Sequence, residues 1–385
     1  MRFELPVELV EIRAAVGELC ARFPGEYWRA LEPDGYPEEF VTALTENGWL
    51  GVLIPEELGG AGLGIAAAAV ILETINSSGC NAGACHAQMY TMGTVLRHGA
   101  PEQKAAYLPK IASGELRLQA FGVTEPSAGS DTTSIQTTAE RVDGGYVIRG
   151  QKIWTSRALH SDLMLLLART TPVDQVEKKT DGLSVFLLDI KAAGDRLDIR
   201  PIKTMMNHAT TEVFFDSVEV PASALVGEEG NGFRCILDGM NAERILIASE
   251  CVGDGRWFVE KAARYASERA VFGRLIGANQ GVQFPIAHAH AAIEAADLVR
   301  HKAAWLYDEG RPCGAEANMA KLLASEASWA AANACLDTYG GYGFAAEYDV
   351  ERKFRENRLY LVAPISTNLI LSYLAEHVLG LPRSF

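Results

Sequence analysis

The sequence predicts an α+β protein in which a β-rich segment lies between two helical regions. Apolar residues recur at helical spacing up to about residue 118 and again from about residue 231, whereas residues 119–226 show the short alternating runs of strands. The middle segment does not alternate strand and helix, which argues against a parallel sheet of βαβ units. With 385 residues the chain is long enough for two or three packed domains.

The first region is predicted to be helical. Leu9, Ile12, Val16 and Leu19 recur at helical spacing, and alanine-rich segments follow them. The stretch "EELGGAGLG" supplies the glycines of a loop within this region. We therefore assign residues 1–118 to an N-terminal helical domain.

The second region is predicted to be built from strands. "GGYVIRGQKIW" follows a DGG turn, and "DLMLLLAR" and "LSVFLLDI" have the length and composition of buried strands. "TEVFFDSVEVP" alternates before a proline that ends it. We assign residues 119–226 to a middle β domain.

The third region, residues 227–385, is predicted to be a C-terminal helical domain with long amphipathic helices. Its stretch "RLYLVAPISTNLILSYLA" is interrupted at Pro364. Proline lacks an N–H group and clashes with the preceding turn, so regular helix should stop at or just before it. No Asp or Glu occurs between Glu356 and Glu376, which matters for the search for a catalytic base.

Composition excludes several classes of protein. The chain is 48% hydrophobic and 22% charged, as is usual for soluble globular proteins, and its formal net charge of −14 argues against nucleic-acid binding. The N-terminus does not resemble a signal peptide, and "AGLGIAAAAVIL" is too short to span a bilayer, so we expect a cytoplasmic protein without membrane insertion. The seven cysteines form no CxxC pair, which indicates free thiols in a reducing compartment. Cys80, Cys85 and His86 lack a distant fourth ligand, so no metal site is expected.

The chain lacks the common nucleotide-binding and hydrolase motifs, but one polar stretch is a candidate ligand site. The chain has no G-x-G-x-x-G, G-x4-G-K, H-E-x-x-H or G-x-S-x-G pattern. Instead, "FGVTEPSAGSDTTSIQTTA" at 121–139 presents hydroxyl groups and a small glycine-containing segment, through which backbone N–H groups can meet an anion. Taken alone, such a stretch is also typical of an ordinary polar turn.

This stretch and the following "GGYVIRGQKIWTSRA" resemble the central motif of the acyl-CoA dehydrogenase family of flavoproteins. Further similar segments occur in the family's order: "EQKAAYLPKIASGE", "VPASALVGEEGNGF", "RYASERAVFGRLIGANQGVQF" and "YGGYGFAAEYDVERKFRENRLY". The resemblance covers essentially the whole chain. It implies an N-terminal helical domain, a β-barrel-like middle domain and a C-terminal four-helix bundle. It also implies FAD as cofactor, an acyl-CoA substrate, electron-transferring flavoprotein as electron acceptor, and a homodimer or homotetramer.

The resemblance also implies which residues bind FAD. The "VTEP" loop and the Trp-containing strand would hold the flavin, and an "ER-x-x-FG" motif and a glycine loop would reach the FAD of a neighbouring subunit. An arginine suits a pyrophosphate because its planar fork matches phosphate oxygens. Relatives often have Gln just before the glycine loop, where this chain has Asp337. An anionic side chain is unfavourable near a pyrophosphate, so a contact of residue 337 with the neighbouring FAD is in doubt. The cofactor residues implied are Val123, Thr124, Ser130, Trp154, Thr155, Ser156, Arg269, Phe272, Gln280, Gly340, Gly341, Ser366 and Asn368.

The implied reaction needs a carboxylate base that removes the α-proton of the thioester while the β-hydrogen passes as hydride to flavin N5. Most relatives carry this base in a "Y-E-G-T" motif, and Pro364 occupies that Glu position here. A minority supply it from another helix in an "L-x-x-E-R-L" motif, and "GMNAERILIASECVG" places Glu243 there. Glu243 is therefore the predicted base, with Glu250, about two helical turns further on, as a rival. Ser130, Asn241 and Arg244 would contact the CoA.

The resemblance to isovaleryl-CoA and citronellyl-CoA dehydrogenases favours a branched or medium-chain acyl group. Two other functions stay open at this point: a flavin oxidase or monooxygenase of the same fold, and a non-catalytic member that binds CoA or a partner. Relatives that are oxidases or monooxygenases usually have another residue in place of the catalytic carboxylate, so the presence of Glu243 argues against that function. His208 could line the flavin pocket, but a lone loop histidine is more often structural.

Overall fold

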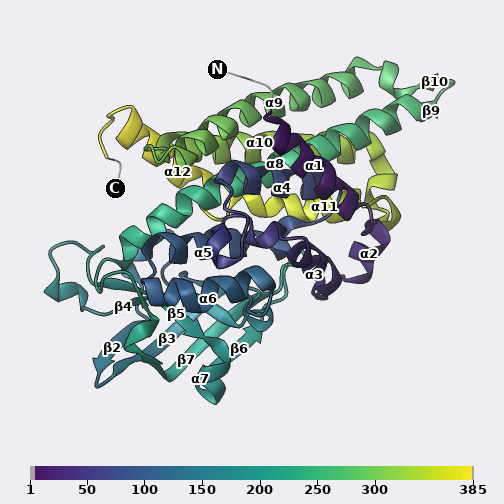
Figure 1. Cartoon of the computed structure of the whole chain (residues 1–385). Coiled ribbons are helices and arrows are strands. Elements are labelled where there is room, and N and C mark those ends of the chain that lie inside the picture. Colours follow the sequence, from purple (N-terminus) through teal and green to yellow (C-terminus); the bar gives the residue numbers. More distant parts are fainter. Residues whose placement is uncertain (1–4, 384–385) are drawn as a thin grey trace. The chain divides into compact units, whose positions relative to one another are not determined.

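The computed structural model describes residues 5–383 and confirms an α+β fold with helical segments before and after a β segment (Figure 1). The predicted helix break at Pro364 is present, since α11 ends at Arg358 and α12 begins at Thr367. The helices are α1 Val7–Cys20, α2 Gly25–Ala30, α3 Glu38–Glu46, α4 Ile65–Ser77, α5 His86–His98, α6 Pro101–Ser113, α7 Ile190–Ala193, α8 Gly232–Glu268, α9 Gln280–Asp308, α10 Gly314–Tyr339, α11 Val350–Arg358 and α12 Thr367–Tyr373. The strands are β1 Ala120–Gly122, β2 Thr138–Val142, β3 Gly145–Ser156, β4 Leu163–Arg169, β5 Leu183–Asp189, β6 Leu197–Pro201, β7 Thr210–Pro221, β8 Leu225–Val226, β9 Ala270–Val271 and β10 Arg274–Leu275.

The chain forms two compact units that do not follow the chain order. Unit 1 contains Met1–Pro33, Gly64–Ala82 and Asn241–Phe385, and unit 2 contains Asp34–Leu63 and Gly83–Met240. The N-terminal helices are therefore divided, with α1, α2 and α4 in unit 1 and α3, α5 and α6 in unit 2. The division into three domains at residues 118 and 226 stays a prediction.

Unit 2 is built on a sheet with the strand order β6-β7-β3-β2-β4-β5-β8, with β1 parallel to β4. All seven residues of β4 are buried, because successive side chains point to opposite faces and both faces are covered. Leu163, Leu165 and Leu167 join a core that includes side chains of α5 and α6. Met164 and Leu166 join a second core made largely by the sheet itself. This explains why "DLMLLLAR" is apolar throughout instead of alternating.

Unit 1 consists mainly of long helices, among which α9 and α10 pack closely. The N-terminus of α4 is capped from the end of α9. The Asp308 carboxylate accepts hydrogen bonds from Ile65 N at 2.6 Å and Ala66 N at 3.0 Å, in place of a capping side chain at Gly64. A Cβ at Gly64 would lie 2.5 Å from Asp308 Oδ2, so glycine is needed for this approach.

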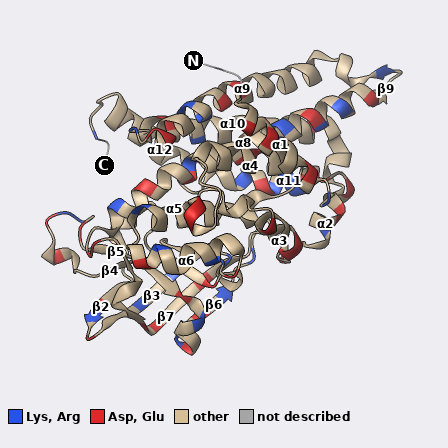
Figure 2. Cartoon of the chain, in the orientation of Figure 1, with Lys and Arg blue, Asp and Glu red and all other residues tan. Residues whose placement is uncertain are grey.

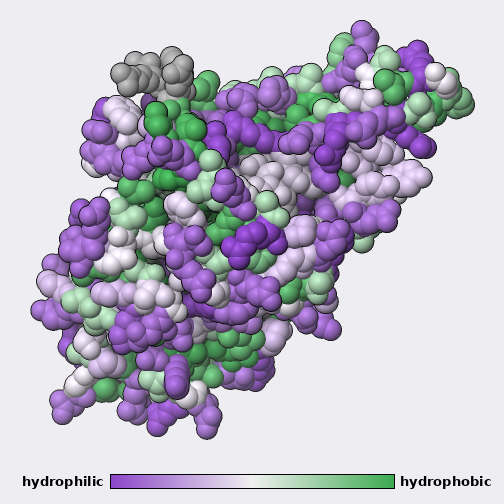
Figure 3. Space-filling view, turned by 45° about the vertical axis from the view of Figure 1, so that its right-hand side comes forward, coloured by the Kyte–Doolittle hydropathy of each residue, from purple (hydrophilic) through white to green (hydrophobic). Residues whose placement is uncertain are grey.

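Charged and apolar side chains are mixed on the surface. In Figure 2, acidic and basic residues are interspersed over both units and are not separated by sign. Figure 3 shows a mostly hydrophilic face on which hydrophobic side chains are scattered, some of them at the end formed by β9 and β10. In the described part of the chain, no helix is both long and apolar enough to cross a membrane.

Candidate active site

A buried ion pair fixes the loop of unit 2 that carries Val123 and Thr124. Lys152 Nζ lies 2.7 Å from Glu125 Oε1 and donates to Val123 O at 3.0 Å. The Glu125 carboxylate also accepts hydrogen bonds from Gln136 N at 2.6 Å and Thr137 N at 2.9 Å. Burial lowers the pKa of Lys152 to about 8, against the opposing effect of Glu125. The pair therefore anchors the "VTEP" loop to β3 from within the core.

Replacing Lys152 by Met is expected to destabilise the protein by about 3–5 kcal/mol, because the Glu125 carboxylate would remain buried without its cation. Urea unfolding followed by circular dichroism measures this loss. The double variant Lys152→Met/Glu125→Gln is the matched control and should regain part of it. A loss below about 1 kcal/mol in the single variant, the range of an exposed ion pair, would contradict the prediction.

The end of β3 presents an exposed aromatic ring beside a buried hydroxyl group. Between Lys152 and Thr155, β3 has one residue more than β7, and Trp154 within this bulge has a φ of 61° and is 58% exposed. Thr155 is buried, and within residues 5–383 its Oγ1 has no hydrogen-bond partner. Ser156 follows as a half-buried residue. An exposed ring and an unsatisfied hydroxyl fit the edge of a bound flavin.

The remaining candidates of unit 2 lie on loops. Ser130 is exposed at the end of the "AGSD" turn, and Val123 and Thr124 are half-buried. His208 Nδ1 lies 3.0 Å from Arg157 Nη2. Burial lowers the pKa of His208 well below its usual value, and Arg157 acts in the same direction, so the imidazole is neutral at physiological pH. A neutral histidine held by an arginine fits a structural role.

In unit 1, a pocket of about 450 Å³ brings together two residues expected at a neighbouring subunit's FAD. Arg269 and Gly341 line it, and the Arg269 guanidinium lies 5.6 Å from the ring centre of Tyr342. Tyr265 and Tyr339, also in the lining, stack with ring centres 4.1 Å apart. The lining residues are Tyr265, Arg269, Val271, Ile276, Thr338, Tyr339, Gly341 and Tyr342.

Other candidates for the FAD contact lie at the surface of unit 1. Phe272 follows β9 with a φ of 51° and is fully exposed, which suits a ring that packs on another molecule. Gln280 is exposed at the start of α9, and Asn368 is exposed near the start of α12. Gly340 has a φ of 56°, a left-handed conformation that favours glycine. Ser366 caps α12 by accepting a hydrogen bond from Leu369 N.

The predicted base and the two residues of α8 predicted to contact CoA lie together on that helix. Glu243 and Arg244 are both 7% exposed, and Arg244 Nη1 donates to Asn241 Oδ1 at 3.0 Å. Burial lowers the pKa of Arg244, and the negative charge of Glu243 opposes this effect. A carboxylate beside a guanidinium in a largely dry environment suits a base that must be ionised before substrate arrives.

Lys321 connects this group to the segment around Pro364. Its side chain is fully buried on α10, and Nζ donates to Ile365 O at 2.8 Å. Burial lowers the pKa of Lys321 to about 8, while the charge of Glu243 acts to raise it. One lysine thus contacts the residue after Pro364 and feels the charge of Glu243. Lys321 was not among the predicted site residues, although its place as a lone lysine in the apolar run "MAKLLA" was a usable signal.

Glu250 has a different environment from Glu243. It is fully buried, and its Oε2 accepts a hydrogen bond from Tyr360 Oη at 2.9 Å. Asn76 Nδ2 donates to Tyr360 Oη at 3.1 Å and to the Glu250 carbonyl oxygen at 3.3 Å. Burial raises the pKa of Tyr360 well above its usual value, with Glu250 adding to the effect, so the phenol stays a donor. These bonds favour a structural role for Glu250.

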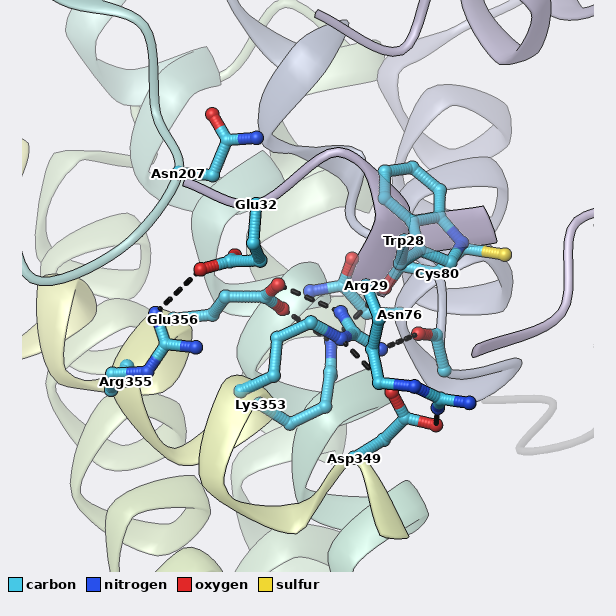
Figure 4. Close-up of polar contacts among 12 residues, drawn as sticks. Trp28, Arg29, Glu32, Asn76, Cys80, Asn207, Asp349, Lys353, Arg355 and Glu356 are labelled. Atoms are coloured by element: carbon cyan, nitrogen blue, oxygen red, sulfur yellow. Dashed lines mark hydrogen bonds and ion pairs between the residues drawn. The ribbon is translucent and has the colours of Figure 1, made fainter. Parts of the chain in front are cut away.

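A second buried ionic network, which the sequence did not suggest, holds α11 in unit 1 (Figure 4). Lys353 Nζ pairs with Asp254 at 2.5 Å and Glu356 at 3.3 Å and donates to Cys80 O at 3.0 Å. Figure 4 also shows the ion pair of Arg355 with Glu32, with an N–O distance of 3.0 Å. Through these contacts α11, which precedes the Pro364 segment, is fixed to α8 and to the chain after α4.

Comparison with known proteins gives the family. Three family models match in order: the acyl-CoA dehydrogenase N-terminal domain at residues 7–115, the middle domain at 120–218 and the C-terminal domain at 230–378. The chain is 35% identical to acyl-CoA dehydrogenase FadE12 of Mycobacterium tuberculosis over 97% of this chain and 96% of that protein.

Two solved structures are also similar. The glutaryl-coenzyme A dehydrogenase–glutaryl-CoA complex has a TM-score of 0.91 at 31% identity, covering 100% of this chain and 98% of that one. A structure described as the electron transferring flavoprotein of Acidaminococcus fermentans has a TM-score of 0.91 at 29% identity, covering 98% and 100%.

The fold and these similarities define a flavin-dependent oxidoreductase of acyl-CoA. The chain belongs to the acyl-CoA dehydrogenase family, as predicted from its motifs. FAD is accordingly its cofactor, and the exposed Trp154 ring and the unsatisfied Thr155 hydroxyl of the described chain fit that group.

Proposed function

We propose that this enzyme dehydrogenates an acyl-CoA thioester between Cα and Cβ to the trans-2-enoyl-CoA, with Glu243 as the general base. The observation that carries this proposal is the shared neighbourhood of Glu243 and the Pro364 segment at Lys321. In the family the base stands at one of these two positions. Only Glu243 offers a carboxylate here, since proline cannot accept a proton.

The chain's own groups have separate tasks in this reaction. The Glu243 carboxylate takes the α-proton, and its near-complete burial removes the water that would otherwise solvate it. Arg244 and Asn241, joined by their hydrogen bond, orient the CoA portion. FAD, when bound against Val123, Thr124 and Trp154–Ser156, supplies the hydride acceptor. Ser130 is proposed to contact the pyrophosphate of FAD or the CoA.

The substrate and partners follow from the same resemblance. A branched or medium-chain acyl-CoA is proposed as substrate, and electron-transferring flavoprotein as electron acceptor. The similarity to the Acidaminococcus fermentans structure supports a relation to that class of protein. The pocket at Arg269 and the fully exposed Phe272 are surfaces that a second subunit and its FAD would complete, so we propose a homodimer or homotetramer.

An anaerobic titration of the FAD-loaded protein with isovaleryl-, citronellyl- and octanoyl-CoA tests the proposed function. At least one thioester is expected to bleach the flavin absorbance, and the reduced flavin should reoxidise slowly when air is admitted. Rapid reoxidation would favour a flavin oxidase instead. An absence of bleaching with all three thioesters would exclude dehydrogenation of these acyl classes and favour a non-catalytic CoA-binding member.

A further inference from the structure

We propose that Lys321 is a positioning residue of this active site, whose ammonium group fixes the turn at Ile365 and holds the Glu243 carboxylate in its ionised form. The inference rests on the proposed function, because it assigns a task to Lys321 only if Glu243 is the base. The packing of α8 against α10, the burial of Lys321 and its charged surroundings support this role.

Two close approaches indicate that α8 and α10 run parallel where they meet. A Cβ on Gly314, at the start of α10, would lie 4.0 Å from Asn241 Oδ1, and a Cβ on Gly255 would lie 3.5 Å from the Cα of Ser328. Both pairs have the same sequence offset, so Lys321 lies at the level of Ala248, between them. Helical side chains lean toward the N-terminus of their helix, which directs the Lys321 side chain toward the level of Glu243 and Arg244.

The ammonium group of Lys321 is buried but not neutralised by an adjacent carboxylate. Its hydrogen bond to Ile365 O uses one of three N–H groups, and within residues 5–383 Lys321 forms no ion pair. A buried cation without a direct partner acts over a longer range than a paired one, because the surroundings screen it weakly.

The charged groups that face Lys321 come from two helices. On α8 they are Glu243 and Arg244, and on α10 the group is Glu326. Arg244 repels the lysine cation, whereas Glu243 and Glu326 attract it. The thiol of Cys251 also faces Lys321, but burial raises its pKa well above its usual value, so it is neutral. Burial of a carboxylate favours its neutral form, so Glu243 needs positive charge nearby to remain ionised. Lys321 and Arg244 both supply that charge.

The Pro364 segment gains a fixed shape from the same contact. Ile365 lies between Pro364 and Ser366, the residue that caps α12, so the bond from Lys321 fixes the turn from which relatives present their C-terminal base. Lys321 therefore has two tasks: it fixes the segment in which Pro364 stands in place of the usual Glu, and it acts on Glu243, the carboxylate proposed to replace that Glu.

The test compares the pH dependence of flavin reduction in wild type, Lys321→Met, Lys321→Gln and Lys321→Arg under anaerobic single-turnover conditions. Without the cation, Glu243 should ionise only at higher pH, so the midpoint of the rate profile is expected to rise by roughly 1 pH unit in the Met and Gln variants. Gln can still donate to Ile365 O, so it separates loss of charge from loss of the turn. Arg should keep the wild-type midpoint. Burial lowers the pKa of Lys321 to about 8, so the wild-type lysine loses its charge above that pH. The rates of flavin reduction in the variants and in wild type should therefore converge there.

Tyr360→Phe is the matched control, since Tyr360 supports the same segment through Glu250 without bringing charge to Glu243. It is expected to lower stability and leave the midpoint unchanged. A uniform fall in rate in Lys321→Gln, with no change of midpoint, would overturn the inference and leave Lys321 a structural residue.

A second measurement does not depend on turnover. Urea unfolding of Lys321→Met, Glu243→Gln and the double variant forms a double-mutant cycle, in which the two substitutions are expected to be non-additive. If no thioester reduces the wild-type flavin, the proposed function and the catalytic task of Lys321 both fail, while this cycle still decides whether the two side chains are coupled. Additive effects would refute the coupling even in an active enzyme.

Discussion

Replacing Glu243 by Gln is expected to slow flavin reduction by acyl-CoA roughly 10²–10⁴-fold, the usual contribution of a positioned general base. Gln cannot accept the α-proton, so the reaction should slow. Because Gln has nearly the same shape as Glu, CoA should still bind. Stopped-flow measurement of flavin bleaching under anaerobic conditions gives the rate. A spectral titration with a non-reducible thioester analogue shows whether the binding site is retained.

Glu250→Gln is the matched control for this experiment, because it neutralises another buried carboxylate on the same helix, the one that was the rival candidate for the base. It is expected to change the rate less than tenfold while weakening the contact with Tyr360. The opposite result, slow reduction in Glu250→Gln and normal reduction in Glu243→Gln, would move the base to Glu250.

Replacing Lys353 by Met is expected to destabilise the protein by about 3–5 kcal/mol, which is a large fraction of a typical folding free energy. Lys353 and Asp254 are fully buried, and Glu356 is nearly so, so the substitution leaves two carboxylates in the core without this cation. Burial raises the pKa of Asp254 to about 6, against the opposing effect of Lys353, and this pKa should rise further in the variant. Urea unfolding curves at pH 8 measure the loss.

The pH dependence of that loss distinguishes the ionic cause from a packing defect. At pH 5 the buried Asp254 of the variant binds a proton and becomes neutral, so the destabilisation should be smaller than at pH 8. The double variant Lys353→Met/Asp254→Asn should regain part of the stability at pH 8. An equal loss at both pH values would point to packing.

The sequence predicted the α+β fold and the helix break at Pro364 because both depend on local patterns. Apolar spacing separates helix from strand, and a proline between two helical runs ends the first. The family followed from long motifs that lie in the same order as in its members. The division into two units was not predictable in this way, because α1 and α4 join helices that follow residue 241.

The parts of the site that the sequence missed are those made by buried charges. Lys152, Lys321 and Lys353 look like surface residues in a linear sequence, since lysine is rarely buried. Their burial is decided by partners far along the chain, such as Glu125, Ile365 and Asp254. Spacing along one helix or strand cannot show those partners. In contrast, Asn241 and Arg244 are one helical turn apart, so their contact could be expected from the sequence.

The assembly of unit 1 from three separate parts of the chain has a consequence for biosynthesis. During translation, α1 and α4 leave the ribosome long before α9, whose final residue Asp308 caps α4. Before that point α1 and α4 can pack on each other, but the face of α4 that contacts α9 has no native partner, whereas most of unit 2 is contiguous and can fold earlier. Contacts with large sequence separation form slowly and leave hydrophobic surface exposed. Nascent chains of this protein should therefore depend on chaperones for the segments around α1 and α4 more than for the sheet.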